Sequence, residues 1–282
     1  MASNREYKSS VFSLLFSDPE ILRELYGALE GIRLPPDALI QINTLSDVIF
    51  LEQLNDLSFL VENKLIILIE HQSTINPNMA IRLLIYIGRI YEKICERKKL
   101  YASQPIAIPR PEFIVLYNGA APYPDQTTLS LSDMFEKAPH LGKGAVPPAL
   151  ELTVRVYNIN NGHNRAIVEK CEELEGYSVF IAKVREFKAE TGDNEKAMRM
   201  AIAHCIENNI LKEFLETNAS EVLNMLLTEW STVEYGEVQR EEGREEGREE
   251  GQNLVVELFD QGYTLEQVKA KLAAMKTVKE ST

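Results

Sequence analysis

The chain has 282 residues, of which 45% are apolar, and it carries a formal net charge of −13. A chain of this length and composition can bury a core that needs no disulfide staples. The acidic balance excludes a protein that coats nucleic acid by bulk attraction, but not an enzyme that touches DNA locally. No run of about 18 apolar residues occurs, and the opening residues MASNREYKSS lack an apolar signal core. We therefore expect neither a membrane span nor export.

Three widely spaced cysteines, Cys95, Cys171 and Cys205, are odd in number and lie in segments of helical pattern. They indicate buried or free thiols in a reducing cytoplasm rather than a disulfide or zinc framework. The sequence contains no P-loop, no dinucleotide-binding glycine pattern and no paired CxxC motif. The expected location is therefore cytoplasmic, with no organic cofactor.

The first half of the chain begins with a predicted helix and continues into strands. Apolar residues at helical spacing predict a helix over residues 7–30, with a break at Ser17-Asp18-Pro19. After Pro35-Pro36, three short segments rich in Ile, Leu, Val and Phe predict a meander of strands at about 45–52, 56–61 and 65–70.

The next elements alternate between helix and strand. A long amphipathic helix is predicted over residues 78–100, followed by a strand at 112–117 that ends at the turn residues Asn118-Gly119. A loop rich in Pro and Gly runs to about residue 148, a strand follows at 150–158, and helices are predicted from 164 to about 230. This order predicts an α/β sandwich whose mixed sheet starts as a meander and continues through a crossover helix.

The C-terminal region contains REEGREEGREEG over residues 240–251, a strict four-residue repeat. One interpretation is a solvated low-complexity helix or linker. The other is a helix whose glycine stripe allows close approach by a second helix, and hence self-association. Short helices are predicted at 252–260 and 265–275, with Thr264 and Gln267 as a capping box. This small unit is expected to expose apolar residues and so to need a partner: Leu254, Val255, Leu258, Leu265, Val268 and Leu272.

The stretch from Asn55 to Ser73 carries the chemistry. Asp56 opens one predicted strand and Glu70 ends the next. A three-residue loop at 62–64 would pair Asp56 with Glu70, whereas a two-residue loop would pair Asp56 with His71. Alternation along the strand places Gln72 on the face of Glu70. Two adjacent carboxylates suit Mg²⁺ or Mn²⁺, although each could also be an ordinary turn or solvated residue. The polar residues directly after the apolar run LIILI favour a site.

A row of basic and aromatic residues follows on the predicted helix over 78–100. It consists of Arg82, Tyr86, Arg89, Lys93 and Arg97, at spacings that place them on one face beside the apolar one. The row is either an ordinary solvated helix face or a surface that follows a DNA backbone, with Arg82 on a phosphate.

The run DLSFLVENKLIILIEHQSTINPNMAIRLLIYIGRIYEK resembles the Rpn family of recombination-promoting nucleases, also labelled PD-(D/E)XK transposases. Further matching pieces are YKSSVFSLLFSDPE, EFIVLYNG, LTVRVYNINNGHN and the Arg-Glu-Gly repeat, so the resemblance covers essentially the whole chain. It implies a restriction-endonuclease-like PD-(D/E)XK core with a mixed sheet flanked by helices over residues 1–160. A helical extension over 161–235 and a repeat helix with a small oligomerisation unit over 236–282 complete the expected organisation.

The resemblance also implies an activity, that of a divalent-metal-dependent DNA endonuclease linked to recombination, mobile elements or defence against foreign DNA. Asp56, Glu70 and the main-chain carbonyl of His71 would hold Mg²⁺ or Mn²⁺, and Gln72 would position the nucleophile. Gln72 departs from the lysine usual at this position and so lacks its charge. The DNA contacts implied or predicted are Arg82, Arg89, Lys93 and Lys8. The alternative is a catalytically weak or inactive nuclease fold that serves DNA binding or assembly as a homo-oligomer.

Overall fold

The structure is a computed structural model that describes residues 10–42, 57–62, 64–95, 97–136, 148–228 and 230. Farther along, it describes Arg248, Val255, Leu258, residues 263–269 and Lys271. Lys8, Asp56, the strand predicted at 45–52 and most of the repeat at 240–251 lie outside these residues. The chain divides into two compact units, residues 1–227 and 228–282.

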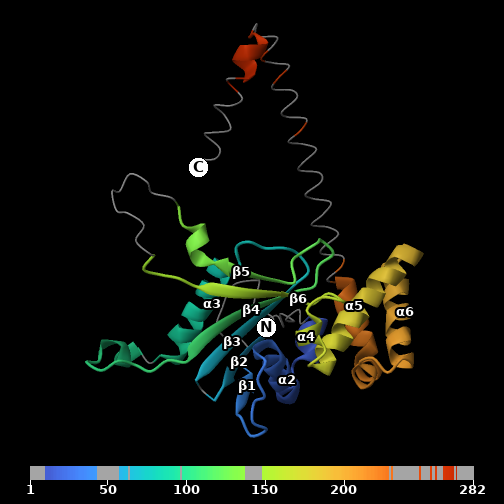
Figure 1. Ribbon diagram of the computed structural model, residues 1–282, viewed down its shortest axis with the longest axis horizontal. Coiled ribbons are helices and arrows are strands. Elements are labelled where there is room, and N and C mark those ends of the chain that lie inside the picture. Colours follow the sequence, from blue (N-terminus) through green and yellow to red (C-terminus); the bar gives the residue numbers. More distant parts are fainter. Residues whose placement is uncertain are drawn as a thin grey trace, which may run out of the picture. The chain divides into compact units, whose positions relative to one another are not determined.

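A six-stranded mixed sheet forms the centre of the first unit, in the order β1-β2-β3-β4-β6-β5 (Figure 1). Strand β2 (Leu57–Val61) pairs antiparallel with both β1 (Ile40–Ile42) and β3 (Leu65–Gln72). Strands β3, β4 (Arg110–Tyr117) and β6 (Thr153–Asn158) are parallel, and β5 (Gln126–Ser130) pairs antiparallel with β6. The mixed sheet is therefore confirmed, as are the meander strands predicted at 56–61 and 65–70, whereas the one predicted at 45–52 lies outside the described residues.

Two strands of the sheet differ from the expectation. Strand β5 lies inside the segment predicted as a loop, and β1 lies before the predicted meander. Strand β5 (QTTLS) is short and polar, and it pairs with one neighbour at the edge of the sheet. It therefore lacks the apolar run by which a buried strand is recognised.

Helices cover both faces of the sheet. The predicted break is confirmed, because α1 (Val11–Leu15) ends before α2 (Pro19–Glu30), where the Asp18 side chain accepts a hydrogen bond from the Glu20 amide at 2.7 Å. Helix α3 (Met79–Ile94) is shorter than predicted. It ends at Cys95, whose backbone is extended, and the 3₁₀ turn η2 (Arg97–Tyr101) follows. Figure 1 shows α3 on one side of the sheet and α2 on the other.

Alternation along the strands divides the core into two layers. Ile66, Leu68 and Val115 pack with Leu83 and Ile87 of α3 on one face. On the opposite face of β3, His71 meets α1 and α5 (Glu172–Thr191), because its ring stacks on Phe12 and its Nε2 is 3.1 Å from the Tyr177 hydroxyl. The crossover from β3 through α3 to β4 therefore encloses one layer, as the order of elements predicts.

The remaining helices follow β6. They are α4 (Arg165–Val168), α5, α6 (Asn194–Glu207) and a helix over 212–228. All three cysteines are free thiols, as predicted. Among the residues that the structure describes, no helix is long and apolar enough to cross a membrane.

In the second unit, the predicted capping box is confirmed. The Thr264 amide donates to Gln267 Oε1 at 2.9 Å. The expectation that this unit exposes its apolar residues is wrong for Leu258 and Val268, which are only 3% and 2% exposed. Leu265 is 56% exposed, as expected.

Candidate active site

The hairpin between β2 and β3 sets the register at the candidate site. Val61 pairs with Leu65 and Leu57 pairs with Ile69, so the three-residue loop is confirmed. The left-handed conformation in this loop belongs to Glu62, with φ of 55°. Asn63, the middle residue of the loop, lies outside the described residues. Asp56 does as well, and its pairing with Glu70 remains a prediction.

Glu70 is a buried carboxylate near the end of a central strand, 4% exposed. It lies on the face covered by α3, where Arg82 Nη2 approaches Glu70 Oε2 at 3.1 Å. The same guanidinium nitrogen donates to the Tyr86 hydroxyl at 3.1 Å. Burial of a charged group is costly unless it is paired and hydrogen-bonded, and Arg82 provides such a partner.

Gln72 lies beside this ion pair. Its Nε2 is 2.7 Å from the sulfur of Met79, and Arg82 Nη1 is 3.4 Å from the same sulfur. The first residue of α3 thus brings the amide of Gln72 and the guanidinium of Arg82 together. The structure therefore gathers Glu70, Gln72 and Arg82 on one face at the end of β3.

His71 points to the opposite face, as the alternation predicts. Its ring stacks on Phe12 with centroids 4.8 Å apart, and its Nε2 is 3.1 Å from the Tyr177 hydroxyl. Burial, together with the nearby positive charge of Arg185, lowers the pKa of His71 to about 3. The imidazole is therefore a neutral core group. The role of the main-chain carbonyl of His71 as a metal ligand stays a prediction.

The predicted basic row does not form one helical face. Tyr86 is 5% exposed and belongs to the core, and Arg82 engages Glu70. Arg97 lies in η2, beyond the end of α3. Arg89 is half-buried and Lys93 is exposed, so of the two only Lys93 fully faces solvent. The row was predicted from a helix that would have continued to residue 100, and the extended backbone at Cys95 ends it earlier.

The chemistry of these donors suits a hard divalent ion. The Glu70 carboxylate and the Gln72 amide supply oxygen, the ligand atom that Mg²⁺ and Mn²⁺ prefer. In the described part of the chain, no three His, Cys, Asp or Glu residues gather as metal ligands. Glu70 provides one carboxylate at the candidate site, and Asp56, the other predicted ligand side chain, lies outside the described residues. An ion bound by Glu70 would share the carboxylate with Arg82.

A polar network that the sequence analysis did not predict lies where β4 and β6 end. Asn158 Oδ1 accepts from the Asn160 side chain at 2.9 Å, and Asn160 Nδ2 also donates to the carbonyl of Gly119 at 3.0 Å. Arg185 of α5 donates from Nη1 to Asn160 Oδ1 at 2.7 Å and from Nη2 to the carbonyl of Asn118. The asparagines of YNINNGHN were a weak signal of this network. Arg185 gave none, because it lies inside a helix of ordinary composition.

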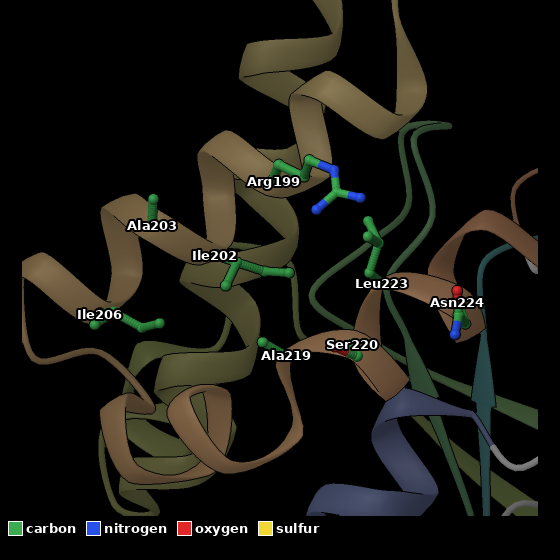
Figure 2. A pocket seen from close by; sticks show the side chains of 8 residues that line it. All are labelled: Arg199, Ile202, Ala203, Ile206, Ala219, Ser220, Leu223 and Asn224. Carbon is green, nitrogen blue, oxygen red and sulfur yellow. The ribbon is translucent and has the colours of Figure 1, made fainter.

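A separate hollow lies between α6 and the helix over 212–228 (Figure 2). It has a volume of about 440 Å³ and is lined mainly by apolar side chains, among them Ile202, Ile206 and Leu223. Arg199 is at its border, 63% exposed at its side chain and paired with Glu195 at 2.7 Å. The hollow brings together no catalytic combination of side chains.

Residues 29–160 match the family model described as "Putative transposase, YhgA-like". This stretch contains all six strands of the described sheet, and with them Glu70, Gln72 and Arg82. No curated protein and no solved structure matches the chain.

Proposed function

We propose that this chain, whose residues 29–160 match the model of the YhgA-like putative transposases, is a divalent-metal-dependent DNA endonuclease on a PD-(D/E)XK core. The observation that carries the proposal is the buried carboxylate of Glu70 near the end of a central strand, grouped with Gln72 and Arg82. A charged group at such a position is costly to the fold. Departures of this kind from a locally consistent sequence are expected at functional sites.

Glu70 would hold Mg²⁺ or Mn²⁺ together with Asp56 and the main-chain carbonyl of His71. Such an ion lowers the pKa of a bound water and neutralises charge on the scissile phosphate. Glu70 is oriented for this task by its ion pair with Arg82 and by the rigid strand that carries it. Gln72 would hydrogen-bond the attacking water and so fix its direction.

Arg82 compensates for the uncharged residue at position 72. Its guanidinium and the Gln72 amide both contact the Met79 sulfur, so the positive charge lies beside the position where a lysine would have placed it. Arginine remains protonated at every relevant pH and presents several N–H donors. In the proposed enzyme, Arg82 both positions Glu70 and stabilises negative charge on the phosphate.

A second candidate function is DNA binding or protein assembly on the same fold without cleavage. Two observations favour it. Gln72 carries no charge, and Arg82 already engages one oxygen of the Glu70 carboxylate. Within this second function, the net charge of −13 favours protein assembly over DNA binding, because it opposes broad contact with DNA.

Plasmid cleavage in Mg²⁺ or Mn²⁺ separates the two functions. The variants are Asp56→Ala and Glu70→Gln, and the matched control is Glu195→Gln, which removes one exposed carboxylate of α6. We expect the wild type and the control to cut, and the other two variants to lose cleavage while their circular dichroism spectra stay native. If none of the four proteins cuts and all are folded, the endonuclease proposal is wrong and the second function applies.

A further inference from the structure

Arg185 is a half-buried cation held by neutral groups. Its two hydrogen bonds to described residues go to the side-chain oxygen of Asn160 and the main-chain oxygen of Asn118, and no carboxylate of the described residues pairs with it. Burial lowers the pKa of Arg185, as expected for a charge taken out of water without a carboxylate beside it. Buried charges are ordinarily paired, so Arg185 has room for an anion that the described residues do not supply.

Asn118 provides a second, independent observation. Its side chain is only 2% exposed, yet neither its Nδ2 nor its Oδ1 finds a hydrogen-bond partner among the described residues. A buried amide left unsatisfied costs about 1–3 kcal/mol, and such groups call for an explanation in a folded protein. A bound ligand with hydrogen-bonding oxygens would satisfy the Nδ2 donor.

The place of the two residues in the fold connects them to the candidate active site. Asn118 directly follows β4, and its main-chain N–H donates a hydrogen bond to the main-chain carbonyl of Gln72 at 2.8 Å. The loops after β3 and β4 pack in close contact at Gly119. A Cβ added to this glycine would lie 2.3 Å from the carbonyl oxygen of Ser73, so only glycine fits there. The carboxyl ends of neighbouring parallel strands are the usual place for a ligand in an open α/β sheet.

We propose that Arg185, with the side-chain amide of Asn118, binds a backbone phosphate of DNA that lies across the active site. The inference rests on the proposed function and names a contact for its substrate. A guanidinium has five N–H donors, of which Arg185 uses two within the protein, so its fork can still bind phosphate oxygens. Arg185 lies beyond residues 29–160, so the matched family region does not include this contact.

Fluorescence anisotropy of a labelled DNA duplex, titrated in EDTA over a range of salt concentrations, tests the contact without cleavage. Arg185→Gln is expected to raise the Kd by about ten- to a hundredfold, the range for losing a hydrogen bond to a charged group. The slope of log affinity against log salt should fall by about one, because one phosphate contact is lost. Asn118→Asp, which brings a negative charge to the phosphate, should also weaken binding.

Arg199→Gln is the matched control. It removes the same charge from an exposed, paired arginine of α6, so its Kd and salt slope should stay close to those of the wild type. Thermal unfolding of each variant separates a structural effect from a binding effect. If Arg185 only ties the loops after β4 and β6 together, Arg185→Gln will melt earlier but will match Arg199→Gln in affinity and salt slope. That result overturns the inference.

The outcome also separates this inference from the proposed function. A wild type that binds DNA through Arg185 but never cuts a plasmid supports the phosphate contact and refutes the endonuclease. A wild type that cuts, with Arg185→Gln unchanged in affinity and salt slope, refutes the contact and leaves the endonuclease standing. A wild type with no measurable affinity for DNA refutes the contact as well.

Discussion

Acidification should destabilise this protein through the neutral ring of His71. This ring stacks on Phe12, lies within hydrogen-bond distance of the Tyr177 hydroxyl and has the positive charge of Arg185 nearby. In the unfolded chain a histidine takes up its proton near pH 6.5, whereas burial holds the pKa of His71 at about 3 in the folded protein. Between these two values the unfolded state binds more protons, so stability falls as the pH falls. The loss is about 1.4 kcal/mol per pH unit, and it stops growing below the folded-state pKa.

From about pH 8 to about pH 5, this linkage amounts to about 2 kcal/mol of the free energy of unfolding. Urea unfolding followed by far-ultraviolet circular dichroism at both pH values measures it. His71→Phe is the comparison, because it keeps an aromatic ring against Phe12 and removes the titrating group. The variant will be less stable at neutral pH, since it loses the hydrogen bond to Tyr177. Its loss of stability on acidification should nevertheless be smaller than that of the wild type by about 2 kcal/mol.

The measured quantity is the loss of stability of the wild type on acidification minus that of His71→Phe. The contributions of all other titrating groups are the same in both proteins and cancel in this difference. If wild type and His71→Phe lose the same free energy between the two pH values, His71 is not held neutral by the fold. The assignment of its ring to the core, with only its main-chain carbonyl near the candidate site, would then be wrong.

Three further predictions concern other parts of the chain. Arg82→Ala should abolish most of the plasmid cleavage, and Gln72→Lys in that background should restore part of it; full activity of Arg82→Ala would refute the role proposed for its charge. Gly119→Ala should cost about 1–3 kcal/mol, because the new Cβ meets the Ser73 backbone, whereas Gly88→Ala in α3 has open space and should gain about 0.5–1 kcal/mol in thermal unfolding. Deletion from residue 236 onward should lower the number of chains per particle, as measured by light scattering, if the C-terminal region holds an oligomer together; an unchanged number of chains would contradict that.

Much of the sheet could be predicted from local pattern. The apolar runs of β2 and β3, with a short polar loop between them, were enough to predict the hairpin and to limit its register to two possibilities, of which the structure has Val61–Leu65. The break before α2 was predictable for the same reason, since Asp18 and Pro19 act on the turn they occupy. Strand β5 and the early end of α3 were not. A polar edge strand depends on its partner, and the backbone at Cys95 follows from no local breaker residue.

The sequence by itself determined that Glu70 and Gln72 share a face and that the side chain of His71 lies on the other, because side chains alternate along any strand. Only the tertiary structure decided what meets them. The ion pair of Arg82 with Glu70 depends on the packing of α3 over that face, and the contacts of Arg185 with Asn118 and Asn160 depend on α5 lying beside the ends of β4 and β6. Such contacts join residues far apart in the chain, and no spacing along the sequence encodes them.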